Sequence, residues 1–214
     1  MNSLLLRPPS EFYHGDALGI AEAIRQSDHS TLTLLLKRTP GVVSDRGQKN
    51  LPILAWAMAH DDVTAFRLLL ESGAPTDDFF LVEKAKWSLL SLAAGAQNTA
   101  FFDLLLTHHA DPNGLPGTEP PLVTAYYARK QDRFDRLLAA GADINHPDKI
   151  GRTVILSAVL GNHYAQALDF VSRGADLHVE AKNGMSIRTL IDRYPLPPDS
   201  DEGRAQAELL RRLK

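Results

Sequence analysis

The chain has 214 residues, of which 44% are hydrophobic and 23% are charged, and its formal net charge at pH 7 is −3. That length allows a large core, and so mild a net charge gives no electrostatic signature of a nucleic-acid partner. The chain has no cysteine, which excludes disulfides, thiol chemistry and sulfur-ligated metal sites. No apolar run approaches the roughly 18 residues of a membrane-spanning helix, so membrane insertion is not expected.

Residues 1–16 are expected to form an irregular lead-in, because Pro8–Pro9 prevents a regular helix there. The opening sequence lacks a basic segment followed by an apolar run, so no export signal is expected in the chain as given. Ser10, His14 and Asp16 could be interpreted as a catalytic group. We favour a loop that ends in a helix cap at Asp16.

Two markers recur along the chain in the same phase. One is a small residue in the first helix of a helix pair, and the other is the residue at the exit of the second helix. Both recur at intervals of 34, 36, 32 and 33 residues. The small residues are Ala23, Ala57, Ala93, Ala125 and Ala158, and the exit residues are Thr39, Gly73, His109, Gly141 and Gly174. Two markers in one phase predict a stacked array of about five helix pairs.

The first pair is expected over residues 17–45 and should be atypical, because only one of its sides has a neighbour. The second pair starts at Leu51–Pro52, where proline suits the first helical position. The connection from 75 to 87 is the longest inside the array and contains the apolar run 79–82. Two outcomes stay open for that run: it projects as a hairpin, or it folds back onto the core.

The remaining pairs follow at similar spacing. They are expected over residues 88–113, 120–145 and 152–178, and a sixth unit begins at 185–194. His109 replaces the exit glycine of its pair, and histidine tolerates a positive φ at modest cost. A proline-rich stretch then leads to a last helix over 199–214, whose single apolar side suits a C-terminal cap.

No pattern in the sequence points to an enzyme. The chain has no Gly-x-Ser-x-Gly nucleophile motif and no His-Glu-x-x-His zinc helix. His108, His109 and Asp111 have the composition of a metal site, but adjacent helical residues point about 100° apart, which is poor ligand geometry. We therefore assign no catalytic residue, no metal and no cofactor.

The period of about 33 residues with paired helices resembles the ankyrin repeat. The matching residues are Thr153, Pro121–Leu122, Leu104–Leu105–Leu106, the exits Gly141–Ala142–Asp143 and Gly174–Ala175–Asp176, and the motif Asp148-x-x-Gly151-x-Thr153. The resemblance covers roughly residues 17–190. It implies an all-α solenoid of about five helix-pair units with short hairpin loops and a C-terminal capping helix. The expected domains are the lead-in 1–16, the repeats 17–194, and the linker with its capping helix 195–214.

The resemblance also implies a binding surface made of the hairpin tips and the inner sides of the first helices. Carried over position by position, it predicts partner contacts at Trp56, His60, Lys84, Lys86, Trp87, Tyr127, Lys149, Ile150 and Arg152. Trp and Tyr dominate binding hot spots because they bury much area with few rotatable bonds. The alternative is that the aromatic residues of this set pack between repeats.

The irregular units resemble those of small bacterial ankyrin-repeat proteins. This implies a non-catalytic protein-binding module, and most specifically an immunity protein that neutralises a toxin such as a lipase-type effector of type VI secretion. The alternatives are a general scaffold, an enzyme-accessory protein or, least favoured, a hydrolase. The expected partner is another protein, and the chain alone is expected to be monomeric. An immunity protein whose leader has been removed would act in the periplasm, and otherwise the cytoplasm is expected.

Overall fold

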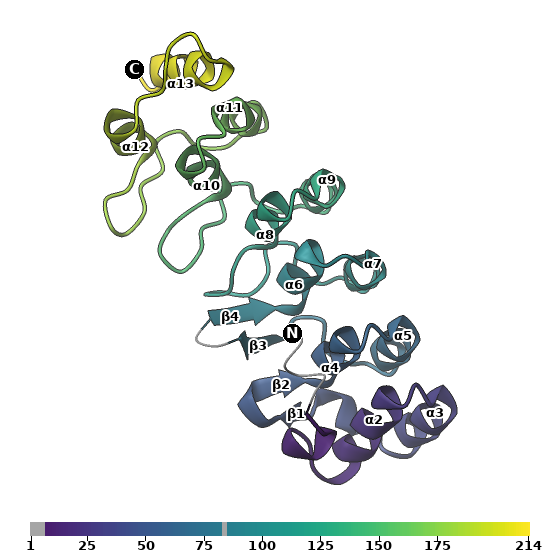
Figure 1. The fold of residues 1–214 in the computed structure, drawn as a ribbon. Helices are drawn as coiled ribbons and strands as arrows, with labels where there is room; N and C mark the ends of the chain where they lie inside the picture. Colours follow the sequence, from purple (N-terminus) through teal and green to yellow (C-terminus); the bar gives the residue numbers. More distant parts are fainter. Residues whose placement is uncertain (1–6, 83–84) are drawn as a thin grey trace. The chain divides into compact units, whose positions relative to one another are not determined.

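The computed structural model describes residues 7–82 and 85–214 (Figure 1). It divides into two compact units, Met1–Pro121 and Leu122–Lys214, which we name the N-terminal and C-terminal units. Short helices joined in antiparallel pairs make up most of both units (Figure 1). The expected all-α array of helix pairs is therefore confirmed.

The N-terminal unit contains three helix pairs, two short hairpins and three single turns of 3₁₀-helix within the described residues. The pairs are α2 (Gly15–Arg25) with α3 (His29–Arg38), α4 (Ile53–Ala59) with α5 (Val63–Glu71), and α6 (Leu89–Gly95) with α7 (Ala100–Thr107). The hairpins are β1 (Arg46–Gly47) with β2 (Leu51–Pro52) and β3 (Phe79–Val82) with β4 (Ala85–Ser88), and the 3₁₀ turns are η1 (Pro9–Glu11), η2 (Pro40–Ser44) and η3 (Gln48–Asn50).

The C-terminal unit continues the same pattern. Its helices are α8 (Pro121–Tyr127, which begins on the last residue of the N-terminal unit), α9 (Gln131–Ala139), α10 (Val154–Leu160), α11 (Tyr164–Ser172), α12 (Ile187–Arg193) and α13 (Asp201–Arg212). The last helix begins at the Ser200 cap, whose hydroxyl oxygen accepts a hydrogen bond from the Gly203 N–H at 3.0 Å. A half-polar helix therefore closes this end of the chain, as expected.

Stacking of equivalent helices builds the core of each unit. In the N-terminal unit α2 packs on α4 and α3 packs on α5, and in the C-terminal unit α10 packs on α12 and α11 on α13. The small marker residues of all five pairs are buried, with exposed fractions of 4% or less. Because a small side chain lets two helices approach closely, the alanine spacing seen in the sequence records this stacking.

The exits of the second helices explain the second marker. Gly73, Gly141 and Gly174 all have φ between 88° and 98°, a region that favours glycine, and His109 takes φ 62° at its equivalent position. Thr39 differs, with φ −133°, because the proline that follows it disfavours a helical conformation at that residue. The tolerance expected of His109 is therefore confirmed.

The apolar run 79–82 forms a hairpin strand and also packs partly onto the core, so each of the two open outcomes holds in part. It forms strand β3, which pairs with β4 so that Phe80 lies opposite Trp87 and Leu81 opposite Lys86. Successive side chains of a strand point to opposite faces. Phe80 is therefore buried, with 2% of its surface exposed, whereas Leu81 is 43% exposed.

The lead-in contributes to the core. Phe12 and Tyr13 follow the turn η1, and both are buried. The Tyr13 hydroxyl donates to the backbone oxygen of Leu51 at 3.2 Å, and burial raises its pKa far above the ordinary value. The expectation of an irregular lead-in is therefore incomplete, because these two aromatic rings pack against Trp56 of α4.

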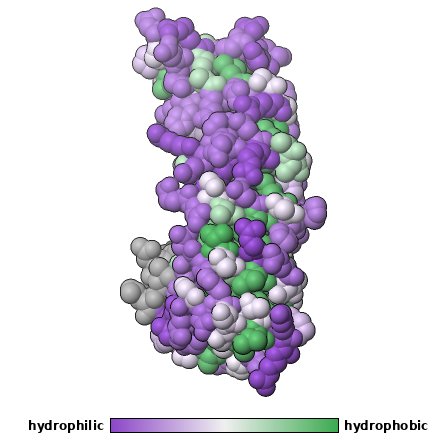
Figure 2. Space-filling view, turned by 90° about the vertical axis from the view of Figure 1, so that its right-hand side faces the viewer, coloured by the Kyte–Doolittle hydropathy of each residue, from purple (hydrophilic) through white to green (hydrophobic). Residues whose placement is uncertain are grey.

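The helices on one face of each unit are mainly hydrophilic on their outer surface. For the N-terminal unit Figure 2 shows the surface over α3, α5 and α7, and for the C-terminal unit, taken by itself, the surface over α9 and α11. Hydrophilic residues cover most of this side, and hydrophobic residues lie between them. Leu34 on α3 is one exposed residue of this kind, at 69%.

Gly151 offers a test of how closely the hairpins of the C-terminal unit pack. It has φ +85°, and a Cβ there would lie 3.2 Å from the Ala181 Cα. Gly141 has φ +94° with nothing within 4 Å of such a Cβ. We expect Gly141→Ala to cost about 1 kcal/mol of stability and Gly151→Ala about 2 kcal/mol, measured by urea unfolding. Equal losses would show that the approach to Ala181 does not constrain the fold.

Candidate functional site

Trp56 is a packing residue, which corrects the expectation that it contacts a partner. None of its surface is exposed, and its indole N–H donates to the backbone oxygen of Ala21 at 3.0 Å. Its ring centroid lies 5.7 Å from that of Phe12 and 5.8 Å from that of Tyr13. The lead-in therefore covers a position that would face a partner in a repeat without such a neighbour.

His60 follows α4 and also belongs mainly to this packing. Its ring centroid lies 4.7 Å from that of Trp56, and its buried Nε2 has no hydrogen-bond partner among the described residues. Burial lowers the pKa of His60, the positive charge of Arg25 lowers it further, and Asp62 partly opposes both effects. The neutral imidazole is thus the form that suits the folded state.

The depressed pKa of His60 predicts a loss of stability in acid. The unfolded chain binds this proton more readily than the folded chain, so protonation below about pH 6.5 favours unfolding. The free energy of unfolding begins to decrease as the pH falls below that value, and the decrease is complete once the pH lies below the pKa of His60 in the folded chain. We expect the melting temperature to fall less between pH 7.5 and 5.5 in His60→Gln than in the wild type. Equal falls in both proteins would contradict this role.

The predicted contacts on the hairpin β3–β4 are partly accessible. Lys86 is exposed, with its Nζ 4.9 Å from the Phe79 ring centroid, and Trp87 is half-buried. Arg46 lies over the same ring and forms an ion pair with Asp78 at 2.9 Å. Lys84 lies outside the described residues. Lys86 and Trp87 therefore stay proposed contacts on the N-terminal unit.

The hairpin before α10 presents two of its three predicted contacts to solvent. Lys149 and Ile150 are exposed, and Ile150 is 38% accessible. Arg152 is partly buried and forms an ion pair with Asp148 at 3.1 Å. One Asp148 carboxylate oxygen also accepts the Arg152 and Ile150 backbone N–H groups, at 2.8 and 2.9 Å. Asp148 thus holds the tip in a shape that leaves Lys149 and Ile150 outward.

Tyr127 is the most exposed of the predicted aromatic contacts, at 52%. Leu160, 33 residues later, takes the same place at the end of α10 and is 45% exposed. The equivalent positions in the N-terminal unit hold Arg25, Ala59 and Gly95. The sequence prediction missed Leu160, although its spacing from Tyr127 could have identified it.

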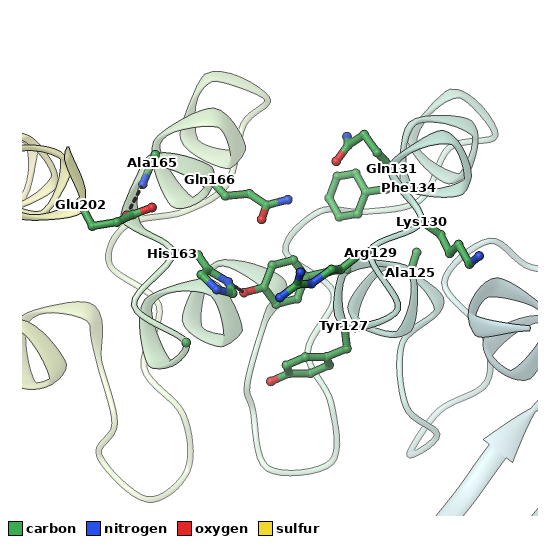
Figure 3. Close-up of a pocket in the computed structure, with 12 residues that line it drawn as sticks. Ala125, Tyr127, Arg129, Lys130, Gln131, Phe134, His163, Ala165, Gln166 and Glu202 are labelled. Atoms are coloured by element: carbon green, nitrogen blue, oxygen red, sulfur yellow. Dashed lines mark hydrogen bonds between the residues drawn. The ribbon is translucent and has the colours of Figure 1, made fainter.

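A groove of about 670 Å³ lies beside Tyr127, within the C-terminal unit (Figure 3). Its walls come from the ends of α8 and α10 and the beginnings of α9, α11 and α13. The lining residues are Ala125, Tyr126, Tyr127, Arg129, Lys130, Gln131, Phe134, Gly161, His163, Ala165, Gln166 and Glu202. We name this feature the C-terminal groove.

A hydrogen bond between Tyr126 and His163 forms the middle of the C-terminal groove. The Tyr126 hydroxyl oxygen lies 2.6 Å from the His163 Nδ1. Burial raises the pKa of Tyr126 to about 12, with smaller contributions from Tyr127 and Glu202, while Arg129 opposes the change. The phenol therefore keeps its proton at neutral pH and can donate it to the imidazole nitrogen.

The charged residues of the groove are unevenly distributed. Arg129 extends toward His163 between Tyr127 on one side and Phe134 on the other (Figure 3). Glu202 lies at the α13 end, where its carboxylate accepts the Ala165 backbone N–H at 2.9 Å and so caps α11 (Figure 3). The one acidic residue of the lining thus already serves a structural purpose.

Solved structures identify the fold. An ankyrin repeat domain from Acinetobacter baumannii AYE matches with a TM-score of 0.68 and 20% identity, over 90% of this chain and 95% of that one. The ankyrin repeat domain of Bcl-3, of the IkappaB protein family, matches with a TM-score of 0.63 and 19% identity, over 90% and 97%. The chain has the ankyrin-repeat fold. Its hairpins β1–β2 and β3–β4 each lie between consecutive helix pairs.

A sequence relative matches part of this ankyrin-fold chain. It is Protein PhlB of Serratia liquefaciens, which is 30% identical over 139 residues. The match covers 64% of this chain and spans 59% of the length of PhlB. No protein-family model matches the chain.

Within the part of the ankyrin-fold chain that the structure describes, no three His, Asp or Glu side chains gather in a group that could hold a metal ion. His108 and His109, which have the composition of a metal site, illustrate this. They lie at the end of α7, where His109 takes a left-handed conformation that reverses the chain. Among the same residues, no helix combines the length and the apolar character that crossing a membrane requires.

Proposed function

We propose that this chain is a non-catalytic protein-binding module. The observation that carries the proposal is the pair of large exposed side chains, Tyr127 and Leu160, at equivalent positions of successive repeats. Two of the three equivalent residues in the N-terminal unit, Ala59 and Gly95, are small, so the fold itself does not require a large apolar side chain there. Ile150 and Lys149 add an exposed apolar and an exposed basic contact on the neighbouring hairpin.

The chemistry of these residues fits a protein partner. Tyrosine is enriched at interfaces because its ring buries a large area while its hydroxyl keeps a polar contact. Repeat solenoids present extended surfaces on which several successive units contact one partner. A standard interface of about 800 Å² per side would require contributions from several units.

The more specific function that we propose is neutralisation of a toxin, with a lipase-type effector of type VI secretion as the partner. The irregular repeat spacing, which the small bacterial ankyrin-repeat proteins share, supports this proposal. The bound array would cover the active site of the toxin or hold the enzyme in an inactive state. Such a protein would act in the compartment where the toxin acts.

Affinity capture from source cells, followed by reconstitution with the purified partner, tests both the protein-binding function and the neutralisation of a toxin. We expect a stoichiometric complex that the Tyr127→Ala, Ile150→Ala double variant weakens by at least about tenfold, while its melting temperature stays near that of the wild type. The matched control is Leu34→Ala, which removes a still more exposed apolar side chain from α3. If the purified partner binds the double variant as tightly as the wild type, the assignment of these residues to the binding surface is wrong.

The activity of the reconstituted partner decides the more specific function. If the partner is a lipase-type enzyme and its hydrolysis stops at one equivalent of this chain, the neutralisation proposal is supported. Unchanged or increased hydrolysis would overturn neutralisation and favour an accessory protein. A partner without enzymatic activity would favour a scaffold.

A further inference from the structure

We propose that the C-terminal groove binds an acidic segment of the partner protein, with a carboxylate on Arg129 and a neighbouring apolar side chain on Tyr127 and Leu160. This inference rests on the proposed protein-binding function and specifies the chemistry of the partner. It depends on the charge of the groove, the state of Arg129 and the apolar residues at the groove edge.

The charged residues of the groove favour an acidic ligand. The lining contains the cations Arg129 and Lys130 and one anion, Glu202. Because Glu202 already accepts the Ala165 N–H, its carboxylate is committed to capping α11. An exposed guanidinium in a concave site favours an acidic ligand.

Arg129 is available for that ligand. It is exposed, and among the described residues its guanidinium forms no ion pair or side-chain hydrogen bond. Two other arginines of this unit differ: Arg152 pairs with Asp148, and Arg173 pairs with Asp135 and Asp169. A guanidinium presents its donors in a planar fork that matches a carboxylate in a bidentate geometry.

The backbone holds Arg129 where it can reach the groove. The residue lies in the turn after α8, in a left-handed conformation with φ 55°, and its N–H donates to the Tyr126 backbone oxygen at 3.0 Å. Figure 3 shows the side chain extending over the groove toward His163 rather than away from the fold. The guanidinium therefore extends from a hydrogen-bonded turn between α8 and α9.

The edge of the groove supplies the apolar half of the site. Tyr127 lines the groove and Leu160 directly precedes Gly161, which also lines it. Both side chains are about half exposed. A volume of about 670 Å³ lies within the 300–1,000 Å³ range of ligand pockets and accommodates a few residues of a peptide. A peptide in which an acidic residue is next to an aliphatic or aromatic residue therefore matches both Arg129 and the apolar edge.

Nuclear magnetic resonance titration of the full chain tests this proposal. The probe is the blocked peptide Ser-Leu-Glu-Phe-Glu-Leu-Ser, and the matched probe has both glutamates replaced by glutamine. We expect the acidic peptide to shift backbone signals of Ala125, Gln131 and Gln166 in a saturable way, and the glutamine peptide to bind at least about fivefold more weakly. Raising the salt to about 0.5 M should weaken the acidic peptide further.

Variants separate the groove from general surface charge. Arg129→Gln should weaken the acidic peptide about fivefold or more, Arg129→Lys should restore part of the affinity, and Tyr127→Ala should weaken both peptides. The control is Arg188→Gln, which removes an exposed arginine on α12 that does not line the groove. Equal binding of the two peptides, or an unchanged affinity in Arg129→Gln, would overturn the proposal. Signals that shift with protein concentration alone would assign the groove to a second copy of the chain and overturn the partner assignment.

The outcome is distinguishable from that of the proposed function. If the reconstituted partner loses affinity for the Tyr127→Ala, Ile150→Ala variant but not for Arg129→Gln, the binding surface stands and the acidic segment is excluded. If neither variant changes partner binding, both proposals fall. If both variants lose affinity for the partner and the chain binds the acidic peptide more tightly than the glutamine peptide, both proposals are supported.

Discussion

Replacing Trp56 with alanine is expected to lower the free energy of unfolding by about 3–5 kcal/mol, the range for removal of a large aromatic side chain from a core. The indole is completely buried and contacts Phe12, Tyr13 and His60. The change also removes the hydrogen bond to Ala21. Urea unfolding followed by circular dichroism at 222 nm measures the loss.

Two further variants show which part of the loss comes from packing. Trp56→Phe keeps an aromatic ring but removes the indole N–H, so it should cost about 1–2 kcal/mol. Tyr127→Ala removes an exposed ring and should change stability by less than about 0.5 kcal/mol. If Trp56→Ala instead unfolds like the wild type and weakens partner binding, Trp56 is a contact and its burial is not what limits stability.

Replacing Gly203 with alanine is expected to destabilise the C-terminal unit by about 3 kcal/mol. Helix propensity alone predicts the opposite sign, because alanine is favoured over glycine by about 1 kcal/mol inside a helix. However, a Cβ at Gly203 would lie only 1.9 Å from the Pro197 backbone oxygen. The first turn of α13 would have to leave the proline-rich stretch that precedes it, and the Ser200 cap would be strained.

A matched control distinguishes this contact from a general effect on α13. Ala207→Gly changes an exposed residue of the same helix and should cost about 1 kcal/mol through propensity. Both variants are measured by urea unfolding. Stabilisation by Gly203→Ala would show that Pro197 moves aside freely and that the stretch before α13 does not constrain the helix.

The repeat array could be predicted from sequence because its signals are local and periodic. The alanine markers recur where the first helices stack, and the exit residues recur where the chain reverses. The burial of Trp56 could not be predicted in the same way. It depends on Phe12 and Tyr13, which lie more than 40 residues earlier in a segment without periodicity.

The candidate site shows a similar division. Tyr127, Lys149 and Ile150 could be placed at the surface because the resemblance gives the hairpin and helix-end positions. The C-terminal groove could not be found from sequence, since α8, α11 and α13 bring together residues up to 77 positions apart. Arg129 has no sequence signal of its own, and only the three-dimensional arrangement shows that Arg152 and Arg173 form ion pairs.

Both tryptophans, Trp56 and Trp87, lie in the N-terminal unit, and the C-terminal unit contains none. Intrinsic fluorescence therefore reports on one half of the molecule without any label. The enclosed indole should emit at shorter wavelength and resist quenching by iodide, while the half-buried one should be quenched more readily. An emission transition that coincides with the ellipticity transition would mean that the two halves melt as one cooperative system, and separate transitions would give each half its own stability.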